Sequence, residues 1–391
     1  MGTTPEDDDV IQPEESGMQY LQLPSNGTGK KERLAYYFQT KRNRSSASTQ
    51  ANVNHSTDQP PQPLLHLSVL FLNGFRSSME GTKAKALEEF CLSSTLPHVD
   101  SFTRFDYRGH GKSTTRTHQC HADHDTDDDA TTSNLHDDGN CNSYKEEEDA
   151  YFHTLGLTDW IEDARQVMLH AFGNSDDTHK IILIGSSMGA WIAFHLALRY
   201  PDRIAGILGI AAAPDFTRDV YQRIWSNPQE LEELHTMGRV LIPSQYGDGP
   251  YPISQHLLED GEQWCLLNTN NSDKDDNPGV VSNHAFSDTD ANENSCSTSK
   301  NAGEKSVIHL ACPVRLIHGQ QDVDIPYTKA LDLADAIAHD NVVVTLIKSG
   351  NHRLSTPKDL DIACRALEEL VRDITASTIT RASTTAAENS K

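Results

Sequence analysis

The chain has 391 residues and a net charge of −24, with 57 acidic and 33 basic residues. Most of this negative charge lies in residues 1–20, 123–149 and 268–306, so the rest of the chain is nearly neutral. The acidic balance argues against nucleic-acid binding. The sequence contains no run of about 18 apolar residues, so no membrane span is expected. An acidic N-terminus and 7 scattered cysteines favour a cytoplasmic location.

Several segments are rich in Asp, Asn, Ser and Thr and poor in apolar residues. Such segments bury too little apolar surface to offset the entropy of ordering, and we expect them to be disordered. Residues 31–375 are expected to form a single domain that contains some of them as insertions. The segments are the N-terminal residues 1–30, the insertions at about 41–63, 114–150 and 268–306, and the C-terminal residues 376–391.

Between these segments, apolar runs alternate with stretches of helical periodicity. Such alternation is typical of βαβ units, so we expect an α/β fold with a mostly parallel central sheet and helices on both faces. In chain order the pattern predicts a strand at 67–72, a helix at 81–93, a strand at 102–106, a helix at 157–172, a strand at 181–184, a helix at 187–200, strands at 204–211 and 313–317, a helix at 327–339, a strand at 342–347 and a last helix at 358–375.

The pentapeptide Gly185-Ser-Ser-Met-Gly189 follows an apolar run and leads into a predicted helix. G-x-S-x-G between a strand and a helix is typical of a nucleophile elbow, in which a serine sits on a tight, strained turn. Small residues two positions before and after the serine avoid a collision within that turn. Ser187 is therefore the candidate nucleophile, and the alternative is an ordinary tight turn.

A serine hydroxyl needs a histidine to accept its proton and a carboxylate to orient that histidine. The expected chain order after the serine is acid, then histidine. Asp322 follows a predicted strand and is the candidate acid; Asp324 is the competitor and is expected to cap the turn before the next helix. Only His352 among the 19 histidines follows the last predicted strand, which makes it the candidate base. We interpret three others as structural: His110, His195 and His318.

Acyl transfer also needs backbone amides that stabilise the developing oxyanion. One candidate is the amide of Met188, at the start of a predicted helix. The other is the amide of Phe75, after Gly74, for which a plain glycine turn is the alternative. The motif D-x-R-G-x-G-x-S at 106–113 is interpreted as a rigid structural loop.

One cluster of histidine, cysteine and aspartate, at residues 118–125, invites interpretation as a metal site. It lies in a polar, low-complexity insertion with nothing to fix the geometry of a metal ion, so no metal site is expected. The proposed chemistry needs no cofactor.

With these motifs the chain resembles the α/β-hydrolase fold. Segments at 75–84, 243–246, 251–253 and 352–355 resemble the palmitoyl-protein thioesterase and acyl-glucuronide esterase branch, which includes a mitochondrial member. The resemblance covers roughly 65–113, 151–267 and 307–375. It implies a small helical cap at about 214–267, and it implies a catalytic triad made of Ser187, Asp322 and His352.

The predicted function is therefore that of a serine hydrolase acting on acyl thioesters or esters, such as S-palmitoyl cysteine or an acyl glucuronide. The substrate would be a small-molecule or protein-linked acyl group. Arg76 or Arg353 would bind a substrate carboxylate, with a structural salt bridge as the alternative. The alternative functions are a non-catalytic binding protein on the same fold and a hydrolase of another bond, such as a peptidase or a C–C hydrolase.

Overall fold

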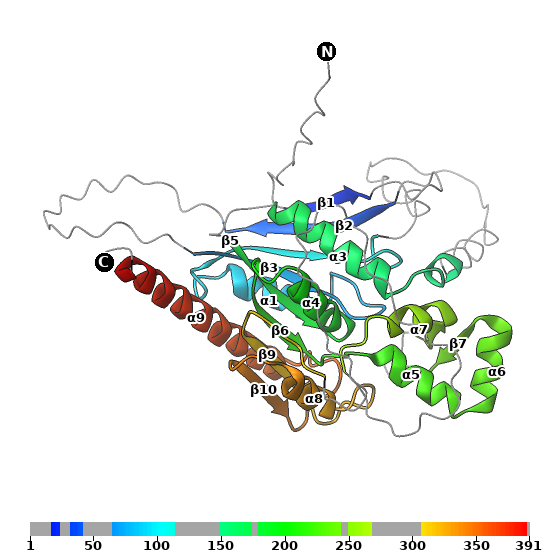
Figure 1. Cartoon of the computed structure of the whole chain (residues 1–391). Helices are drawn as coiled ribbons and strands as arrows, with labels where there is room; N and C mark the ends of the chain where they lie inside the picture. Colours follow the sequence, from blue (N-terminus) through cyan, green and yellow to red (C-terminus); the bar gives the residue numbers. More distant parts are fainter. Residues whose placement is uncertain are drawn as a thin grey trace, which may run out of the picture.

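The computed structural model describes residues 17–23, 32–41, 65–113, 149–173, 179–243, 249–267 and 306–388 (Figure 1). Its centre is an eight-stranded sheet in the order β1-β2-β4-β3-β5-β6-β9-β10. The strands from β4 to β10 in that order run parallel, while β2 is antiparallel to both of its neighbours. The strands are β1 (Gly17–Gln22), β2 (Arg33–Thr40), β3 (His66–Leu72), β4 (Val99–Phe105), β5 (His179–Ser186), β6 (Ile204–Ile210), β9 (Val314–Gly319) and β10 (Val342–Ile347).

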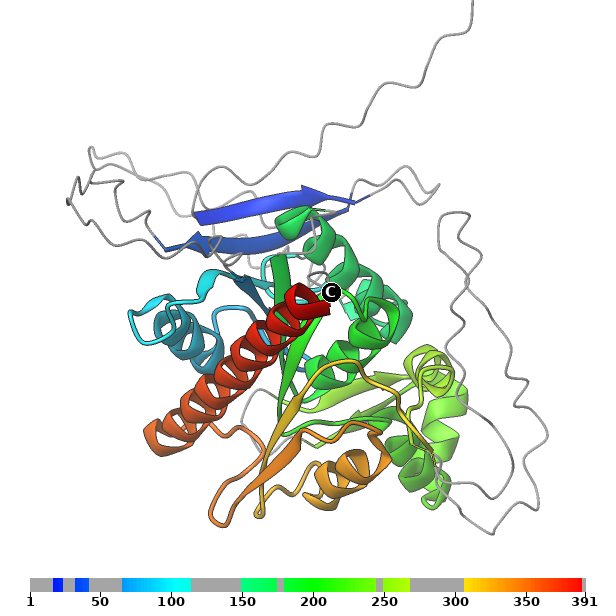
Figure 2. The same ribbon diagram turned by 60° about the vertical axis from the view of Figure 1, so that its left-hand side comes forward.

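Helices cover both faces of this sheet, as the alternating pattern predicts. One face packs against α1 (Thr82–Leu92) and α9 (Pro357–Glu388), and Figure 2 shows α9 crossing in front of the sheet. The other face packs against α3 (Leu157–Phe172), α4 (Met188–Arg199) and α8 (Thr328–Ala336). The mostly parallel sheet between two helical layers confirms the predicted α/β class.

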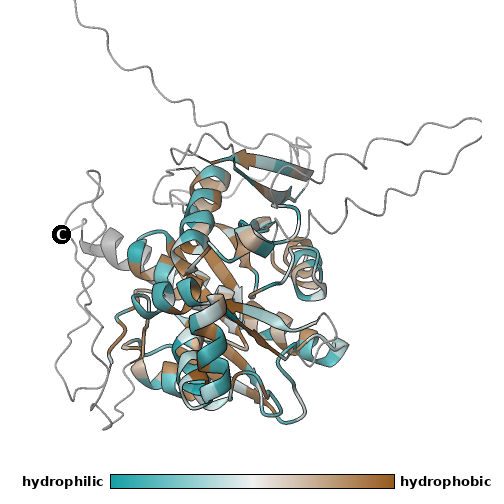
Figure 3. Cartoon of the chain, turned by 90° about the vertical axis from the view of Figure 1, so that its right-hand side faces the viewer, coloured by the Kyte–Doolittle hydropathy of each residue, from teal (hydrophilic) through white to brown (hydrophobic). Residues whose placement is uncertain are grey.

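Strand β3 shows how one apolar run fills both cores. Leu70 and Leu72 pack with the residues of α3 and α4, whereas Val69 and Phe71 pack with those of α1 and α9. Successive side chains of a strand point to opposite faces, so a strand buried on both faces must be apolar throughout. Figure 3 shows the central strands in the brown of hydrophobic residues and the surrounding helices with teal, hydrophilic faces.

The segment between β6 and residue 267 forms a compact unit beside the sheet (Figure 1). The resemblance predicts a helical cap here, but the segment also contains a two-stranded antiparallel sheet, in which residues 239–242 pair with residues 251–254. Its two ends meet at Asp215, whose carboxylate accepts the amides of Leu266 and Leu267 at 2.7 and 2.8 Å. The elements are α5 (Phe216–Trp225), α6 (Pro228–Met237), β7 (Arg239–Ile242), β8 (Tyr251–Ser254) and α7 (Gln255–Glu262).

Two predictions of disorder are wrong in part. Strand β1 lies within residues 1–30, where pairing with β2 over its whole length supplies hydrogen bonds that composition does not indicate. Helix α9 continues through most of residues 376–391. The insertions at 41–63, 114–150 and 268–306 lie almost wholly outside the described residues, as does the cluster at 118–125. No helix within the described ranges combines the length and apolar character needed to cross a membrane.

Candidate active site

The turn between β5 and α4 holds Ser187 in a conformation that side chains rarely adopt, with φ 55° and ψ −118°. A Cβ on Gly185 would lie 2.3 Å from Ala190 Cα, and a Cβ on Gly189 would lie 2.1 Å from Leu72 O. Both contacts are with backbone atoms, so movement of a side chain could not relieve either collision. The two glycines therefore allow α4 to start directly against β3, with the serine at the apex of the turn.

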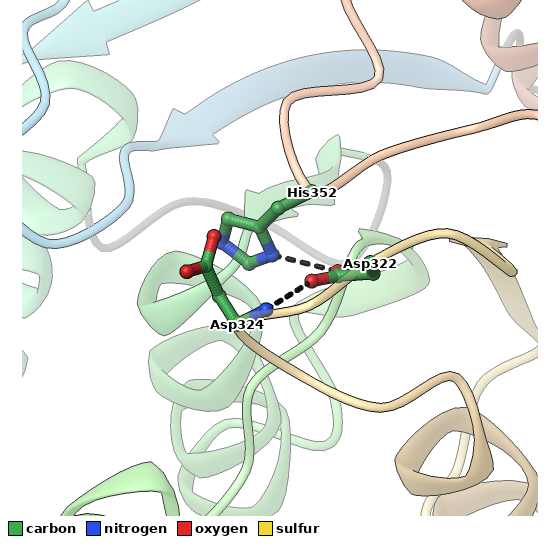
Figure 4. Close-up of side chains that lie close together, drawn as sticks. All are labelled: Asp322, Asp324 and His352. Atoms are coloured by element: carbon green, nitrogen blue, oxygen red, sulfur yellow. Dashed lines mark hydrogen bonds and ion pairs between the residues drawn. The ribbon is translucent and has the colours of Figure 1, made fainter. Parts of the chain in front are cut away.

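Ser187, His352 and Asp322 lie in one hydrogen-bonded series. His352 Nε2 is 3.0 Å from Ser187 Oγ, and His352 Nδ1 is 2.7 Å from Asp322 Oδ2 (Figure 4 shows the second contact). The three residues come from the turns after β5, β9 and β10, which meet at one edge because the strands are parallel. An ionised carboxylate only accepts, so Nδ1 carries the proton and Nε2 is left to accept from the serine hydroxyl.

The Asp322 carboxylate is buried and fully hydrogen-bonded. Its Oδ1 accepts the amides of Asp324 and Ile325 at 3.0 and 2.9 Å. Burial alone would raise the pKa of Asp322, but hydrogen bonds from His318 and His352 hold that pKa well below its usual range. The carboxylate therefore stays ionised beside the imidazole.

The prediction that Asp324 caps the turn is wrong, because Asp322 accepts the amides there. The Asp324 side chain is exposed and points toward the His352 ring (Figure 4). Its carboxylate, a His352 nitrogen and an Asp322 oxygen lie within 4.8 Å of one another, a spacing that a metal ion could use. The His352 nitrogen that faces Asp322 carries a proton, however, and cannot also bind a metal ion there.

Sequence reasoning missed the contact that His318 makes with the site. This histidine is fully buried on β9, and its Nε2 lies 3.1 Å from Asp322 Oδ2 and 3.0 Å from Ile325 O. A carbonyl oxygen only accepts, so His318 Nε2 is the donor in both contacts. The available signal was its position four residues before Asp322, at the end of the same strand.

The candidate oxyanion amides flank the serine. Met188 is the first residue of α4, where backbone amides have no intrahelical partner. A Cβ on Gly74 would lie 3.3 Å from Ser187 Cβ, which places the loop before Phe75 against the nucleophile. Within the described residues, neither the Phe75 amide nor the Met188 amide donates a hydrogen bond, so both are available to a substrate oxygen.

A buried histidine, His110, supports this loop. Arg76 has a φ of 56°, and its amide donates to His110 Nε2 at 3.0 Å. His110 Nδ1 in turn donates to Arg108 O at 3.1 Å. Burial lowers the pKa of His110 to about 4, so the ring is neutral at neutral pH and can accept the Arg76 amide.

The 106–113 motif has the structural contacts that a rigid loop needs. The Asp106 carboxylate accepts the amides of Met79 and Lys112 at 2.6 and 2.9 Å. The Arg108 side chain donates to the fully buried carboxylate of Asp163 on α3 at 2.7 Å. The motif thereby joins the loop after β3 to the helix layer, and none of these side-chain contacts is with Ser187, Asp322 or His352.

Aromatic rings surround Phe75. Its ring centroid lies between 5.6 and 6.1 Å from those of Phe152, Trp160, Phe216 and Tyr251. Phe216 and Tyr251 belong to the 214–267 segment, so this segment packs directly on the loop that carries the candidate oxyanion amide. The arrangement gives the site an apolar, aromatic border.

The two candidate carboxylate-binding arginines are placed differently. The Arg76 guanidinium lies 4.6 Å above the Phe152 ring, and it forms no ion pair with any described residue. The charge of Arg76 also acts on His153, a residue whose Nε2 accepts a hydrogen bond from Arg239 of β7 at 2.5 Å. Burial and the charges of Arg239 and Arg76 lower the pKa of His153, and Asp149 partly opposes this shift. Arg353 has an exposed side chain, and its carbonyl accepts a hydrogen bond from Lys83 Nζ at 2.6 Å.

Comparison with known proteins agrees with this architecture. The chain is 27% identical over 306 residues to the mitochondrial palmitoyl-protein thioesterase ABHD10 of mouse, covering 78% of this chain and 74% of that protein. The human protein of that name is 27% identical over 307 residues, covering 78% and 72%.

Two solved structures share the fold. A putative hydrolase from Agrobacterium vitis S4 has a TM-score of 0.60 at 24% identity, and mouse alpha/beta hydrolase domain-containing protein 10 has a TM-score of 0.55 at 22% identity. Each comparison covers 91% of this chain and 99% of the other. Residues 68–348, which are most of the chain, match the sequence family described as the alpha/beta hydrolase fold. The sheet, the turns that carry the site and this match lead to one conclusion: the chain belongs to the alpha/beta hydrolase family.

Proposed function

We propose that this chain is a serine hydrolase that cleaves acyl thioesters or esters through an acyl-enzyme on Ser187. The observation that carries the proposal is the hydrogen-bonded series from Ser187 Oγ through His352 to the buried Asp322 carboxylate. Free amides beside the serine support the same chemistry, because acyl transfer creates negative charge on the carbonyl oxygen.

In the proposed reaction, Ser187 Oγ attacks the acyl carbonyl while His352 Nε2 takes the hydroxyl proton. The Asp322 carboxylate stabilises the imidazolium that forms, and the amides of Phe75 and Met188 bind the oxyanion. His352 then donates the proton to the departing thiol or alcohol. Water attacks the acyl-enzyme with His352 as general base, which releases the acid and restores the serine.

The substrate proposal is a fatty acyl group, such as palmitate on a cysteine. The name of the mammalian relatives, palmitoyl-protein thioesterase, supports it. The aromatic border around Phe75 and the 214–267 segment, proposed to act as a cap, would accommodate an acyl chain. We further propose that Arg76, rather than Arg353, binds a substrate carboxylate such as that of an acyl glucuronide, because Arg76 has no acidic partner among the described residues.

The relatives' names also bear on location. They are described as mitochondrial, whereas the 7 scattered cysteines of this chain favour a reducing compartment such as the cytoplasm. We propose the cytoplasm as the location. Fractionation of cells that express the full chain tests this: recovery with mitochondrial matrix markers would overturn it.

Labelling with a fluorophosphonate probe tests the reaction. We expect the probe to modify Ser187 in the wild-type chain, and we expect Ser187→Ala to abolish labelling and esterase activity. Ser186→Ala is the matched control, since it changes the neighbouring serine and leaves the nucleophile. A folded wild-type chain that stays unlabelled while a known serine hydrolase is modified would overturn the proposal.

Substrate class is tested separately, by comparing kcat/KM for three substrates. These are a palmitoyl-thioester peptide, an acyl glucuronide and a short p-nitrophenyl ester. A preference for the palmitoyl thioester is expected. Labelling of Ser187 without turnover of any of the three would leave the nucleophile in place and refute the substrate proposal.

A further inference from the structure

Lys83 connects α1 to the loop that carries His352. It lies in the first turn of α1, and its Nζ donates a hydrogen bond of 2.6 Å to the carbonyl of Arg353. Arg353 directly follows His352 in the chain. Lys83 and Arg353 thus belong to two of the segments, 75–84 and 352–355, that carry the family resemblance, and their contact joins these two segments in space.

The loop that carries His352 needs such support. Leu354 has a φ of 42°, a left-handed conformation that strains a residue with a branched side chain. Within the loop, the Asn351 carboxamide oxygen accepts the amides of Arg353 and Leu354 at 3.1 and 3.3 Å. These bonds are internal to the loop and cannot fix its position relative to Ser187. The bond from Lys83 comes from a helix packed on the sheet, and so it can.

The charge of Lys83 also reaches the site. Burial, and to a smaller extent the charge of Arg353, lower the pKa of Lys83 to about 8, against the opposing effect of Asp322 and Asp359. The side chain is therefore mostly protonated at pH 7 and within electrostatic reach of the Asp322 carboxylate. Lys85, two residues further along the same helix, pairs instead with Glu80 at 2.7 Å and is more than half exposed.

We propose that Lys83 is a positioning residue for the reaction proposed above: its ammonium holds the backbone after His352 so that Nε2 stays within hydrogen-bonding distance of Ser187, and it adds positive charge behind the Asp322–His352 pair. The inference rests on the proposed function, since positioning matters only if His352 acts on Ser187. It assigns a role to a residue that contacts neither Ser187 nor the candidate oxyanion amides.

Two consequences separate this role from a purely structural one. Lys83→Met keeps the aliphatic stem and removes the donor, so kcat should fall about 10-fold or more while KM changes little, because a hydrogen bond to a charged group is lost away from the substrate. Removal of the positive charge should also favour the imidazolium form of His352. The low-pH side of the kcat/KM profile should then move to higher pH.

The experiment compares Lys83→Met, Lys83→Gln, Lys83→Arg and the matched control Lys85→Met. We would measure kcat, KM and the pH profile with a neutral p-nitrophenyl ester, the rate of fluorophosphonate labelling, and the melting temperature. Lys83→Arg should recover most of kcat and the wild-type pH profile. Lys83→Gln keeps a donor without charge and should recover kcat in part but not the pH profile. Lys85→Met should match the wild type.

Several outcomes would overturn the inference. One is a folded Lys83→Met chain with wild-type kcat and pH profile; another is a loss of activity with an unchanged profile that Lys83→Arg does not recover. If Lys83→Met fails to fold, a wild-type profile in Lys83→Gln refutes the electrostatic role. A wild-type chain that the probe does not label refutes the proposed function itself, which keeps the two failures distinguishable.

Discussion

His318 and His352 donate hydrogen bonds to the same oxygen, Oδ2 of Asp322, at 3.1 and 2.7 Å. The other oxygen accepts two backbone amides, so a single carboxylate receives four hydrogen bonds. One of the two histidines is buried within the sheet and the other faces the serine. Each additional donor fixes the carboxylate in the orientation that His352 requires, and each favours its ionised form.

Replacing the buried member of this pair should slow the reaction without weakening substrate binding. His318→Phe keeps the ring volume and removes the donor, so we expect kcat to fall about 10-fold with KM nearly unchanged, in line with the loss of a hydrogen bond to a charged group. His195→Phe is the control, because His195 lies on helix α4 and its Nε2 bonds to Trp264 O rather than to Asp322. Equal losses of kcat in both variants would show that the effect is general destabilisation.

Replacing each of the two aspartates, Asp322 and Asp324, by asparagine tests which of them is the catalytic acid. Asp322→Asn should lower kcat by about 10⁴-fold, because a carboxamide no longer selects the required histidine tautomer. Asp324→Asn should change kcat by less than about 5-fold, since exposed charges interact weakly. A large loss in Asp324→Asn beside an active Asp322→Asn would reverse the assignment.

Buried neutral histidines make the fold sensitive to acid. Burial lowers the pKa of His110 and of His195 from 6.5 to about 4. Between these values the unfolded chain binds protons that the folded chain does not, so the free energy of unfolding should decrease as the pH falls from 6.5 toward 4. Urea unfolding at pH 7.5 and 5.5 measures this decrease.

His195→Phe provides the internal check of that pH dependence. It removes one of the two histidines, and the decrease between pH 7.5 and 5.5 should become smaller than in the wild type. The same slope in both chains would show that other groups cause the acid sensitivity.

Charge on the substrate should reveal the contribution of Arg76. Arg76→Gln should raise KM for an acyl glucuronide about 10-fold, the scale of one charge-assisted hydrogen bond, and leave KM for its neutral methyl ester unchanged. Arg223→Gln is the control, because Arg223 is an exposed arginine of α5 that pairs with Glu230 at 2.9 Å. Equal changes for both substrates would exclude carboxylate recognition by Arg76.

Long apolar patterns in the sequence predict the elements of the sheet well. The helix at 157–172 and the strand at 342–347 agree residue for residue with α3 and β10. Strand β1 escaped detection because its six residues, Gly17–Gln22, alternate between partly buried and exposed, and pairing with β2 stabilises it. Composition describes a segment by itself and cannot report pairing with a segment further along the chain.

The candidate site shows the same boundary between local and long-range information. Chain order and position after strands single out Ser187, Asp322 and His352, which the fold places in contact. The contacts of His318, His110 and Lys83 depend on how loops fold back on one another. A histidine within an apolar strand, or a lysine on a helix, gives no local sign of which carboxylate or carbonyl it will meet.

The closure of the 214–267 segment at Asp215 separates two tasks within one chain. Two amide hydrogen bonds to this one carboxylate hold the two ends of the segment together. The side chains of the hydrogen-bonded series, by contrast, come from turns after β5, β9 and β10, outside the segment. The length of chain between the two ends of the segment can therefore change without moving the turns that carry Ser187, Asp322 and His352.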